Sequence, residues 1–336
     1  MPSAERKDSN MAVIVTLTMN PALDLSSDTD TLDPGHKTRC EPPRRTPGGG
    51  GINVARGLQD LGDEVLAVYP SGGPTGDAFE RLLSQLGVTG KTLPIAGDLR
   101  QNLSLRVRDT GEVLHLVFPG PALAQQEWQA CADAVASLDP APDLLVLSGS
   151  LPRDVPLDFY AGLARRVAGR GTRVVLDTNG PALRAALDAG APLYLIKPNR
   201  NECRELLDLP DTGDAPGPDA YLAAMSQLVR DGAAAAVVVT LGAQGAVLAS
   251  EDLQVHLRPP AVRGRAPVGA GDSFVCALVH RLAAGGALLE AAIDGVAAAA
   301  AAVKTRDTRL FRPADLTALR TEVEVRHRSP GDQGGL

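Results

Sequence analysis

Three small residues, Gly269-Ala270-Gly271, precede a carboxylate, Asp272, at the start of an apolar stretch that predicts a helix. Small residues let the backbone approach a ligand closely, and the free amides and positive dipole end of a helix N-terminus favour an anion. A carboxylate repels an anion, so Asp272 needs another purpose. A base that takes a proton from a hydroxyl, while the adjacent amides hold a transferring phosphoryl group, accounts for both features. Taken alone, the motif is equally typical of a helix cap.

A second glycine-rich loop also leads directly into a predicted helix, and it contains four glycines: Gly48, Gly49, Gly50 and Gly51. Such a loop permits close approach of a small polar ligand, and Asn53, in the helix, can both donate to and accept from hydroxyl groups. The dinucleotide fingerprint G-x-G-x-x-G would need a third glycine at Asn53, which argues against a nicotinamide-dependent dehydrogenase. A flexible linker is the weaker alternative, because a well-patterned helix follows at once.

Polar residues also follow predicted strands, where parallel sheets present their ligand-binding groups. Asp24 follows residues 20–23 at the end of the first strand, and its carboxylate suits sugar hydroxyls, a helix N-cap or a turn. Another strand ends in Thr240, Gly242 and Gly245, which fit contact with a nucleotide phosphate or ribose. A simple strand–loop–strand turn explains these three residues equally well.

Residues 197–202 read Lys-Pro-Asn-Arg-Asn-Glu and open a predicted helix after an apolar strand. The oxygens of Asn199 and Glu202 suit a hydrated Mg²⁺, which takes few direct protein ligands. The same spacing is typical of a capping box, with Asn199 at the N-cap and Glu202 three residues on. One pair of residues can serve both purposes.

Three basic residues lie in or beside a polar segment: Lys37, Arg39 and Arg100. A solvated charged face is the ordinary explanation for such residues. A phosphorylated substrate would need a cation, and arginine suits a phosphate best. A Walker A loop is absent, because the stretch that ends at Thr92 begins with Gln85 where the motif needs a glycine.

Short apolar runs alternate with longer helical patterns along the chain, which predicts a mostly parallel sheet with helices on both faces. The expected strands are residues 12–17, 65–69, 144–147, 174–176, 193–196 and 237–240. The expected helices include residues 52–61, 78–86, 157–168 and 220–230.

Two segments break this alternation and predict a small separate sheet. Residues 25–45 are polar and interrupt the first strand–helix unit, and residues 102–107 and 113–118 flank an Asp-Thr-Gly turn as a β-hairpin. A hairpin outside the main alternation suggests a lid. A second copy of the chain would cover its apolar face, which favours a homodimer over packing on its own domain.

Composition excludes several classes of protein. The chain has 336 residues, of which 44% are hydrophobic, enough for a large core, and its net charge of −7 argues against nucleic acid as a partner. The four cysteines are widely separated, which indicates a reducing cytoplasm rather than a disulfide or zinc framework. No apolar run approaches a membrane span. Residues 1–10 lack the apolar region of a signal peptide and are expected to be disordered, as are residues 326–336.

Together these motifs resemble the ribokinase-like (PfkB) family of carbohydrate kinases, from residue 11 to about residue 316. The most specific segments are residues 48–56 and 268–273, in that order, with Asp24 and residues 197–202 and 240–245 around and between them. The resemblance implies an α/β fold, a three-layer α/β/α sandwich with a small β-sheet lid. It implies one kinase domain over residues 11–325, with the lid formed by about 25–45 and 100–118, and a cytoplasmic kinase that uses ATP and Mg²⁺.

The resemblance also implies a role for each motif on the sugar side. Asp272 would be the general base, and the backbone of Gly269, Ala270 and Gly271 would stabilise charge on the γ-phosphoryl group. Asp24, Asn53 and the backbone of residues 48–51 would hold the sugar. The candidates for a sugar phosphate are Lys37, Arg39, Arg100 and Ser150, one of the basic residues coming from a partner's lid.

On the nucleotide side, the resemblance implies that six residues serve ATP and its Mg²⁺: Lys197, Asn199, Glu202, Thr240, Gly242 and Gly245. Asn199 and Glu202 would meet the metal ion through water.

Within the family the chain looks most like the kinases of phosphosugars, above all those that act on fructose 6-phosphate. The segments that carry this likeness are residues 16–18, 47–56, 100–103, 118–120 and 148–152. They imply phosphorylation of the 1-hydroxyl to fructose 1,6-bisphosphate, a reaction of glycolysis. Gly50 stands where kinases of fructose 1-phosphate and tagatose 6-phosphate usually carry a lysine.

Two alternatives remain open. The stretch Asn-Pro-Ala-Leu-Asp at residues 20–24 is just as typical of the fructose 1-phosphate kinases, so that substrate and tagatose 6-phosphate stay as alternatives. A non-catalytic sugar or nucleotide sensor on the same fold is the alternative from a different class. The intact base and anion site argue against it.

Overall fold

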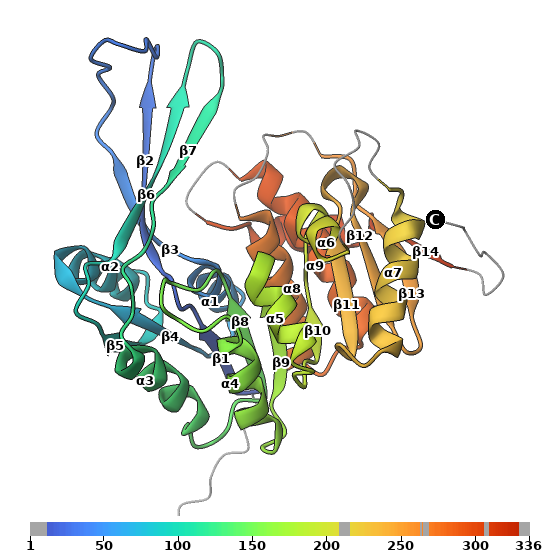
Figure 1. The fold of residues 1–336 in the computed structure, drawn as a ribbon. Helices are drawn as coiled ribbons and strands as arrows, with labels where there is room; N and C mark the ends of the chain where they lie inside the picture. The colour runs from blue at the N-terminus through green and yellow to red at the C-terminus, as the bar shows by residue number, and fades with distance from the viewer. Residues whose placement is uncertain (1–11, 208–215, 263, 265–268, 306–308, 329–336) are drawn as a thin grey trace, which may run out of the picture.

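A ten-stranded sheet runs through the centre of the computed structural model, which describes residues 12–207, 216–262, 264, 269–305 and 309–328 (Figure 1). From edge to edge its strands are β14 (Glu324–His327), β13 (Gln254–Arg258), β12 (Ala246–Ser250), β11 (Ala236–Thr240), β10 (Leu195–Ile196), β9 (Arg173–Asp177), β8 (Leu144–Ser148), β1 (Ile14–Leu17), β4 (Val65–Ser71) and β5 (Thr89–Pro94). The strands from β11 to β5 are parallel, and β12, β13 and β14 continue the sheet antiparallel. The mostly parallel sheet predicted from the sequence is confirmed.

The inner strands are mostly apolar because both faces of the sheet are covered. All four residues of β1 and all five of β8 are buried. Their side chains alternate between two cores: Ile14 packs in the one and Val15 and Leu17 in the other.

Helices cover both faces and complete the three layers. On one face lie α1 (Gly50–Asp60), α2 (Gly73–Gln85), α8 (Ala270–Ala283), α9 (Leu288–Lys304) and α10 (Pro313–Arg320). On the other lie α3 (Gln125–Ala136), α4 (Phe159–Ala168), α5 (Gly180–Asp188), α6 (Arg200–Leu206) and α7 (Pro218–Arg230). Among the described residues, none of these helices has the length and apolarity to cross a membrane.

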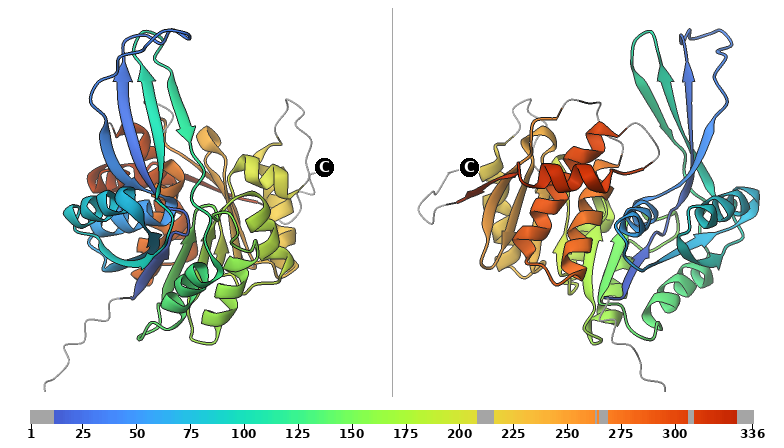
Figure 2. Two further views of the ribbon diagram at one scale, coloured as in Figure 1. Left: turned by 60° about the vertical axis from the view of Figure 1, so that its left-hand side comes forward. Right: turned by 180° about the vertical axis from the view of Figure 1, so that it is seen from behind.

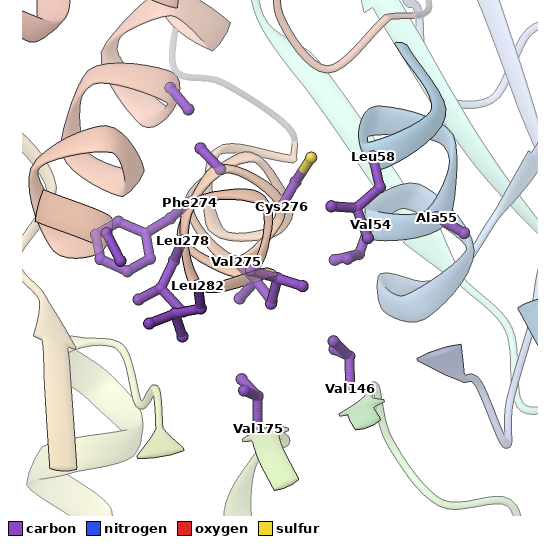
Figure 3. Close-up of a cluster of buried hydrophobic side chains, with 14 of the residues drawn as sticks. Val54, Ala55, Leu58, Val146, Val175, Phe274, Val275, Cys276, Leu278 and Leu282 are labelled. Carbon is purple, nitrogen blue, oxygen red and sulfur yellow. The ribbon is translucent and has the colours of Figure 1, made fainter. Parts of the chain in front are cut away.

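Helix α8 packs between α1, α9 and the sheet, and this fixes the position of its N-terminus (Figure 3). Cys276 faces Val54 and Leu58 of α1, while Phe274 lies on the opposite side of the helix. Glycines allow the close approach: a Cβ on Gly295 of α9 would lie 2.8 Å from the Phe274 ring. The small residues of α9 therefore serve helix packing.

A four-stranded sheet stands away from this body as a lid, as Figures 1 and 2 show from three sides. Its strand order is β3 (Arg44–Gly48), β2 (Ala22–Thr29), β6 (Arg100–Val107) and β7 (Val113–Val117). The hairpin is confirmed as β6 and β7. The first lid segment is longer than the predicted residues 25–45. Strand β2 begins at Ala22 and β3 ends at Gly48, and these two residues pair.

The sequence predicts that both ends of the chain are disordered, and the structure describes part of the C-terminal end only. Residues 1–10 lie outside the described residues. The expectation of a disordered tail from residue 326 is wrong for Arg326 and His327, which pair with β13 as part of β14. The apolar signal of a strand is weak there because β14 is an edge strand, and edges carry charged side chains.

Candidate active site

The N-terminus of α8 carries Asp272 in its first turn, and the structure does not use that carboxylate as a cap. The N-cap is Gly269, whose φ of 85° lies in the left-handed region that favours glycine. Asp272 Oδ2 instead accepts a hydrogen bond of 2.8 Å from Asn53 Nδ2. Residues 219 positions apart are thus joined, and the carboxylate faces the glycine-rich loop.

The four glycines pack against the protein's own side chains. A Cβ on Gly48 would lie 1.9 Å from Asp24 Oδ2, and one on Gly50 would lie 2.1 Å from Ser148 Oγ. A larger residue at either position would displace a polar group at the carboxyl end of the sheet. The loop therefore positions Asp24 as well as leaving room for a ligand.

Asp24 lies at the base of β2 and is held by the neighbouring lid strand. Asn102 Nδ2 of β6 donates to Asp24 Oδ1 over 2.8 Å. Burial raises the pKa of Asp24, and the Asn102 hydrogen bond and the charges of Arg100 and Arg56 act in the opposite direction. Asp24 is also close enough to Asp272 for its charge to contribute to the raised pKa of Asp272.

A polar cluster beside Asp24 joins two of the predicted phosphate ligands. Arg100 donates through Nη2 to Asn20 O over 2.9 Å and through Nη1 to Phe118 O over 3.3 Å. Asn20 Nδ2 in turn donates to Ser150 Oγ over 3.1 Å. The Ser150 hydroxyl accepts here, so its own proton is available for a phosphate oxygen.

The other two predicted phosphate ligands, Lys37 and Arg39, do not reach this cluster in the same chain. Both are exposed, and Arg39 O accepts from Thr29 Oγ1 at the far end of β2. Five residues of strand separate Thr29 from Asp24, about 16 Å. Within one chain the two residues therefore lie away from this cluster, and their binding to a sugar phosphate stays a prediction that needs a partner's lid.

A buried ion pair lies close to Asp272. Lys197 Nζ lies 3.0 Å from Asp177 Oδ1, at the end of β9, and 3.6 Å from the Cβ position of Gly271. Burial opposes the charge on Lys197, but Asp177 outweighs it, and the pKa of Lys197 is raised. A protonated amine therefore stands beside the amides at the start of α8.

Asp272 is surrounded by charges of both signs. Burial and the nearby Asp177 raise its pKa to about 6, against the lowering effects of the Asn53 hydrogen bond and of Lys197. A carboxylate with such a pKa is a better base than an exposed one.

Asn199 and Glu202 form a complete capping box at α6. Asn199 Oδ1 accepts from the amides of Asn201 and Glu202 at 2.8 and 3.0 Å, and Glu202 Oε2 accepts from Asn199 N at 2.7 Å. These bonds occupy the Asn199 oxygen, so Glu202 Oε1 is the atom of the pair that fits a hydrated Mg²⁺. Among the described residues there is no cluster of three His, Cys, Asp or Glu side chains that would hold a metal ion directly.

An apolar pocket of about 670 Å³ opens next to the capping box. Thr240, Gly242 and Gly245 line one wall, and Phe274 and Ala299 contribute to the wall formed by α8 and α9. Gly245 is required by the backbone, because its φ is 86° and a Cβ would lie 1.9 Å from Leu257 O. The pocket fits a flat apolar group whose polar end points at Gly271.

Four residues that contribute to this site were not predicted from the sequence for these roles: Asn20, Arg56, Asn102 and Asp177. Asp177 directly follows the predicted strand 174–176, and this position at the carboxyl end of a parallel strand was the available signal. Asn20 and Asn102 act through side-chain partners that lie 130 and 78 residues away, and no local pattern marks such pairs.

The model of the pfkB family carbohydrate kinases matches residues 10–315. An ATP-dependent 6-phosphofructokinase isozyme 2 of Escherichia coli is 38% identical over 300 residues, covering 89% of this chain and 95% of the relative. A 1-phosphofructokinase of Xanthomonas campestris is also 38% identical, over 271 residues, covering 80% of this chain and 83% of the relative. Identity alone therefore does not separate the two substrates.

Among solved structures, that of phosphofructokinase-2 from Escherichia coli in complex with fructose-6-phosphate superposes with a TM-score of 0.85 at 37% identity. The match covers 93% of this chain and 99% of the other. The similarity extends over the lid as well as the sandwich.

Proposed function

The chain belongs to the pfkB family of carbohydrate kinases, and we propose that it transfers the γ-phosphoryl group of ATP to the 1-hydroxyl of fructose 6-phosphate. The observation that carries this proposal is the place of Asp272. It lies at an anion-binding helix N-terminus, in hydrogen-bond contact with Asn53 of α1. Asn53 follows the glycine-rich loop of residues 48–51, here called the sugar loop. A hydroxyl bound at Asp24 and Asn53 would lie between a base and a phosphoryl group.

In the proposed reaction, Asp272 accepts the proton of the 1-hydroxyl as its oxygen forms a bond to the γ-phosphorus. The bond between that phosphorus and the bridging oxygen breaks, and ADP leaves. The amides of residues 269–271 stabilise the charge on the phosphoryl oxygens, and Lys197 adds a positive charge beside them. Mg²⁺ neutralises charge on the phosphates of ATP, and Glu202 Oε1 would contact it through water.

The sugar phosphate is proposed to bind the cluster beside Asp24. Arg100 brings a positive charge to this cluster, and Ser150 has a hydroxyl proton to donate. Without a phosphate on the sugar, the charge of the half-buried Arg100 would have only the backbone carbonyls of Asn20 and Phe118 as hydrogen-bond partners, which selects for a phosphorylated substrate.

Gly50 supports fructose 6-phosphate over the alternatives. A side chain at this position, such as the lysine usual in kinases of fructose 1-phosphate and tagatose 6-phosphate, would start 2.1 Å from Ser148 Oγ. This chain therefore has no cation in the glycine run and relies on the Arg100 cluster. A substrate phosphate at that cluster leaves the other end of the sugar beside Asp272.

The test is turnover with ATP and Mg²⁺ against fructose 6-phosphate, fructose 1-phosphate, tagatose 6-phosphate and unphosphorylated fructose, compared by kcat/KM. We expect the highest value for fructose 6-phosphate. A preference for another phosphosugar would overturn the substrate and retain the kinase. Binding without turnover of any sugar would instead support the sensor alternative.

We also propose a homodimer through the lid. Leu25, Leu103 and Leu116 pair across β2, β6 and β7 on one face of the lid sheet, and Leu116 is 46% exposed. A second lid would cover this apolar face. In such a dimer, Lys37 and Arg39 are free to approach the partner's site. Sedimentation of Leu116→Asp should show a monomer where the natural chain gives a dimer.

The cytoplasm is the proposed location. All four cysteines are free, and three of them are buried, which suits a reducing compartment.

A further inference from the structure

Arg56 lies behind the sugar loop, one helical turn after Asn53 and on the same face of α1. Its Nη1 atom donates to Pro47 O over 3.3 Å and to Asn53 Oδ1 over 3.4 Å. It thus contacts both the residue before the glycine run and the side chain that bonds Asp272.

These contacts leave the Asn53 amide with one orientation. A guanidinium only donates and a carboxylate only accepts hydrogen bonds. Asn53 must therefore turn Oδ1 to Arg56 and Nδ2 to Asp272, where the distance is 2.8 Å. The reversed amide would set an oxygen against the carboxylate and an NH₂ group against the guanidinium, two repulsive contacts.

We propose that Arg56 is a positioning residue that fixes the Asn53 amide, so that its N–H group holds and orients the Asp272 carboxylate. Arg56 also ties Pro47, and with it the start of the sugar loop, to the same helix. The proposal rests on the proposed function only in giving Asp272 the part of base. The geometry of the three side chains is independent of it.

Other charged groups face Asp272 from every neighbouring element. They are Asp177 of β9, Lys197 after β10 and Asp24 of β2. Cys276 of α8 also lies near Asp272, but burial raises its pKa and keeps it a neutral thiol. Arg56 is not among the groups that shift the pKa of Asp272 directly, whereas the Asn53 hydrogen bond is. The contact with Asn53 is the route by which Arg56 would act as a positioning residue, and a direct effect of its charge would persist without Asn53.

The first experiment needs no activity. The aspartate carboxyl carbons are labelled with ¹³C and titrated by NMR, with Asp272 assigned by its loss in Asp272→Asn. In Arg56→Met the freed Asn53 amide should weaken its bond, and the Asp272 pKa should rise by about one unit. Arg81→Met, which removes an exposed arginine of α2, is the matched control and should leave Asp272 unchanged.

A double-mutant cycle then separates positioning from a general structural effect. In an Asn53→Ala background, Arg56→Met should move the Asp272 pKa by less than about a quarter of a unit, because the relay is already broken. A shift of equal size in both backgrounds, or none in either, would overturn the proposal. If Arg56→Met does not fold, Arg56→Lys takes its place, with a smaller shift in the same direction expected.

Kinetics give a second readout. Arg56→Met should lower kcat at pH 7 about tenfold with little change in the KM for ATP, and should recover part of the loss at pH 8.5 as Asp272 ionises. A kcat loss that is constant with pH would argue for a merely structural role. If Asp272 titrates as expected but no sugar is phosphorylated, the proposed function fails and the positioning role stands.

Discussion

The sugar side and the nucleotide side of the site are built in different ways. On the sugar side, polar side chains bond one another: Asn53 with Asp272, Asn102 with Asp24 and Asn20 with Ser150. On the nucleotide side, glycine turns, a capping box and an apolar pocket of about 670 Å³ provide the contacts. Paired side chains respond sharply to a single change, whereas backbone and apolar surface tolerate one. Substrate selection should therefore depend mostly on the sugar side.

The largest effect is expected where the two sides meet, at Asp272. Asp272→Asn keeps the shape of the side chain and removes the base, so kcat should fall roughly 10³-fold while the sugar still binds. Steady-state kinetics and calorimetric sugar binding measure the two quantities. Near-normal turnover would remove Asp272 from the role of base.

The second prediction tests the sugar side alone. Arg100→Ala should raise the KM for the phosphosugar about 100-fold and leave the KM for ATP nearly unchanged, because a charged hydrogen-bond donor is lost beside Asp24. Arg81→Ala on α2 is the control and should change neither constant. Equal effects of Arg100→Ala on both substrates would show that the two sides are not separable.

The third prediction tests the nucleotide side. Ala299 lies on the α9 wall of the apolar pocket, and Ala299→Leu should fill part of it. The KM for ATP should rise about tenfold with little change for the sugar. Ala130→Leu places the same extra volume on an exposed position of α3 and should be silent. A larger effect of Ala299→Leu on the KM for the sugar than on the KM for ATP would contradict the distinction between the two sides.

The smallest predicted effect is a change in folding stability caused by Asp272, which lies where the two sides of the site meet. The pKa of Asp272 is about 6 in the folded chain, above its ordinary value of 3.8. The folded state therefore binds the proton more tightly, and stability contributed by the protonated carboxyl is lost as the pH rises from about 4 to about 6.

Asp272→Asn, which has no charge to bury, should then raise the free energy of unfolding at pH 7 by about 1 kcal/mol, after allowance for solvent screening. Urea unfolding at pH 7 and at pH 4 measures the gain, which should shrink at the lower pH. A variant that is less stable than the natural chain at both pH values would contradict this account.

The sequence predicted those parts of the molecule whose signal is local. Apolar runs identified the parallel strands, and short motifs identified Asp272, Asn53 and the capping box at Asn199. It could not predict that the carboxylate of Asp24 occupies the space where a Cβ of Gly48 would be, since this depends on a strand pairing formed in space.

Lys37 and Arg39 show that nearness in the sequence does not imply nearness in the structure. Their charge and their nearness in sequence to Asp24 suggested a shared site, but β2 carries the chain away from the pocket before it reaches them. Asp177 was missed because its partner, Lys197, belongs to the next parallel strand, and the pairing depends on the order of strands in the sheet.

The lid strands carry the proposed sugar ligand Asp24 near their base and an apolar face along their length. From Asp24 to the end of β2 at Thr29 the strand extends about 16 Å, so a tilt of roughly 10° at Asp24 displaces that end by about 3 Å. A small rotation of the strand around a bound sugar therefore becomes a larger displacement at its far end. In a lid-to-lid dimer, this movement would couple sugar binding in one subunit to sugar binding in the other.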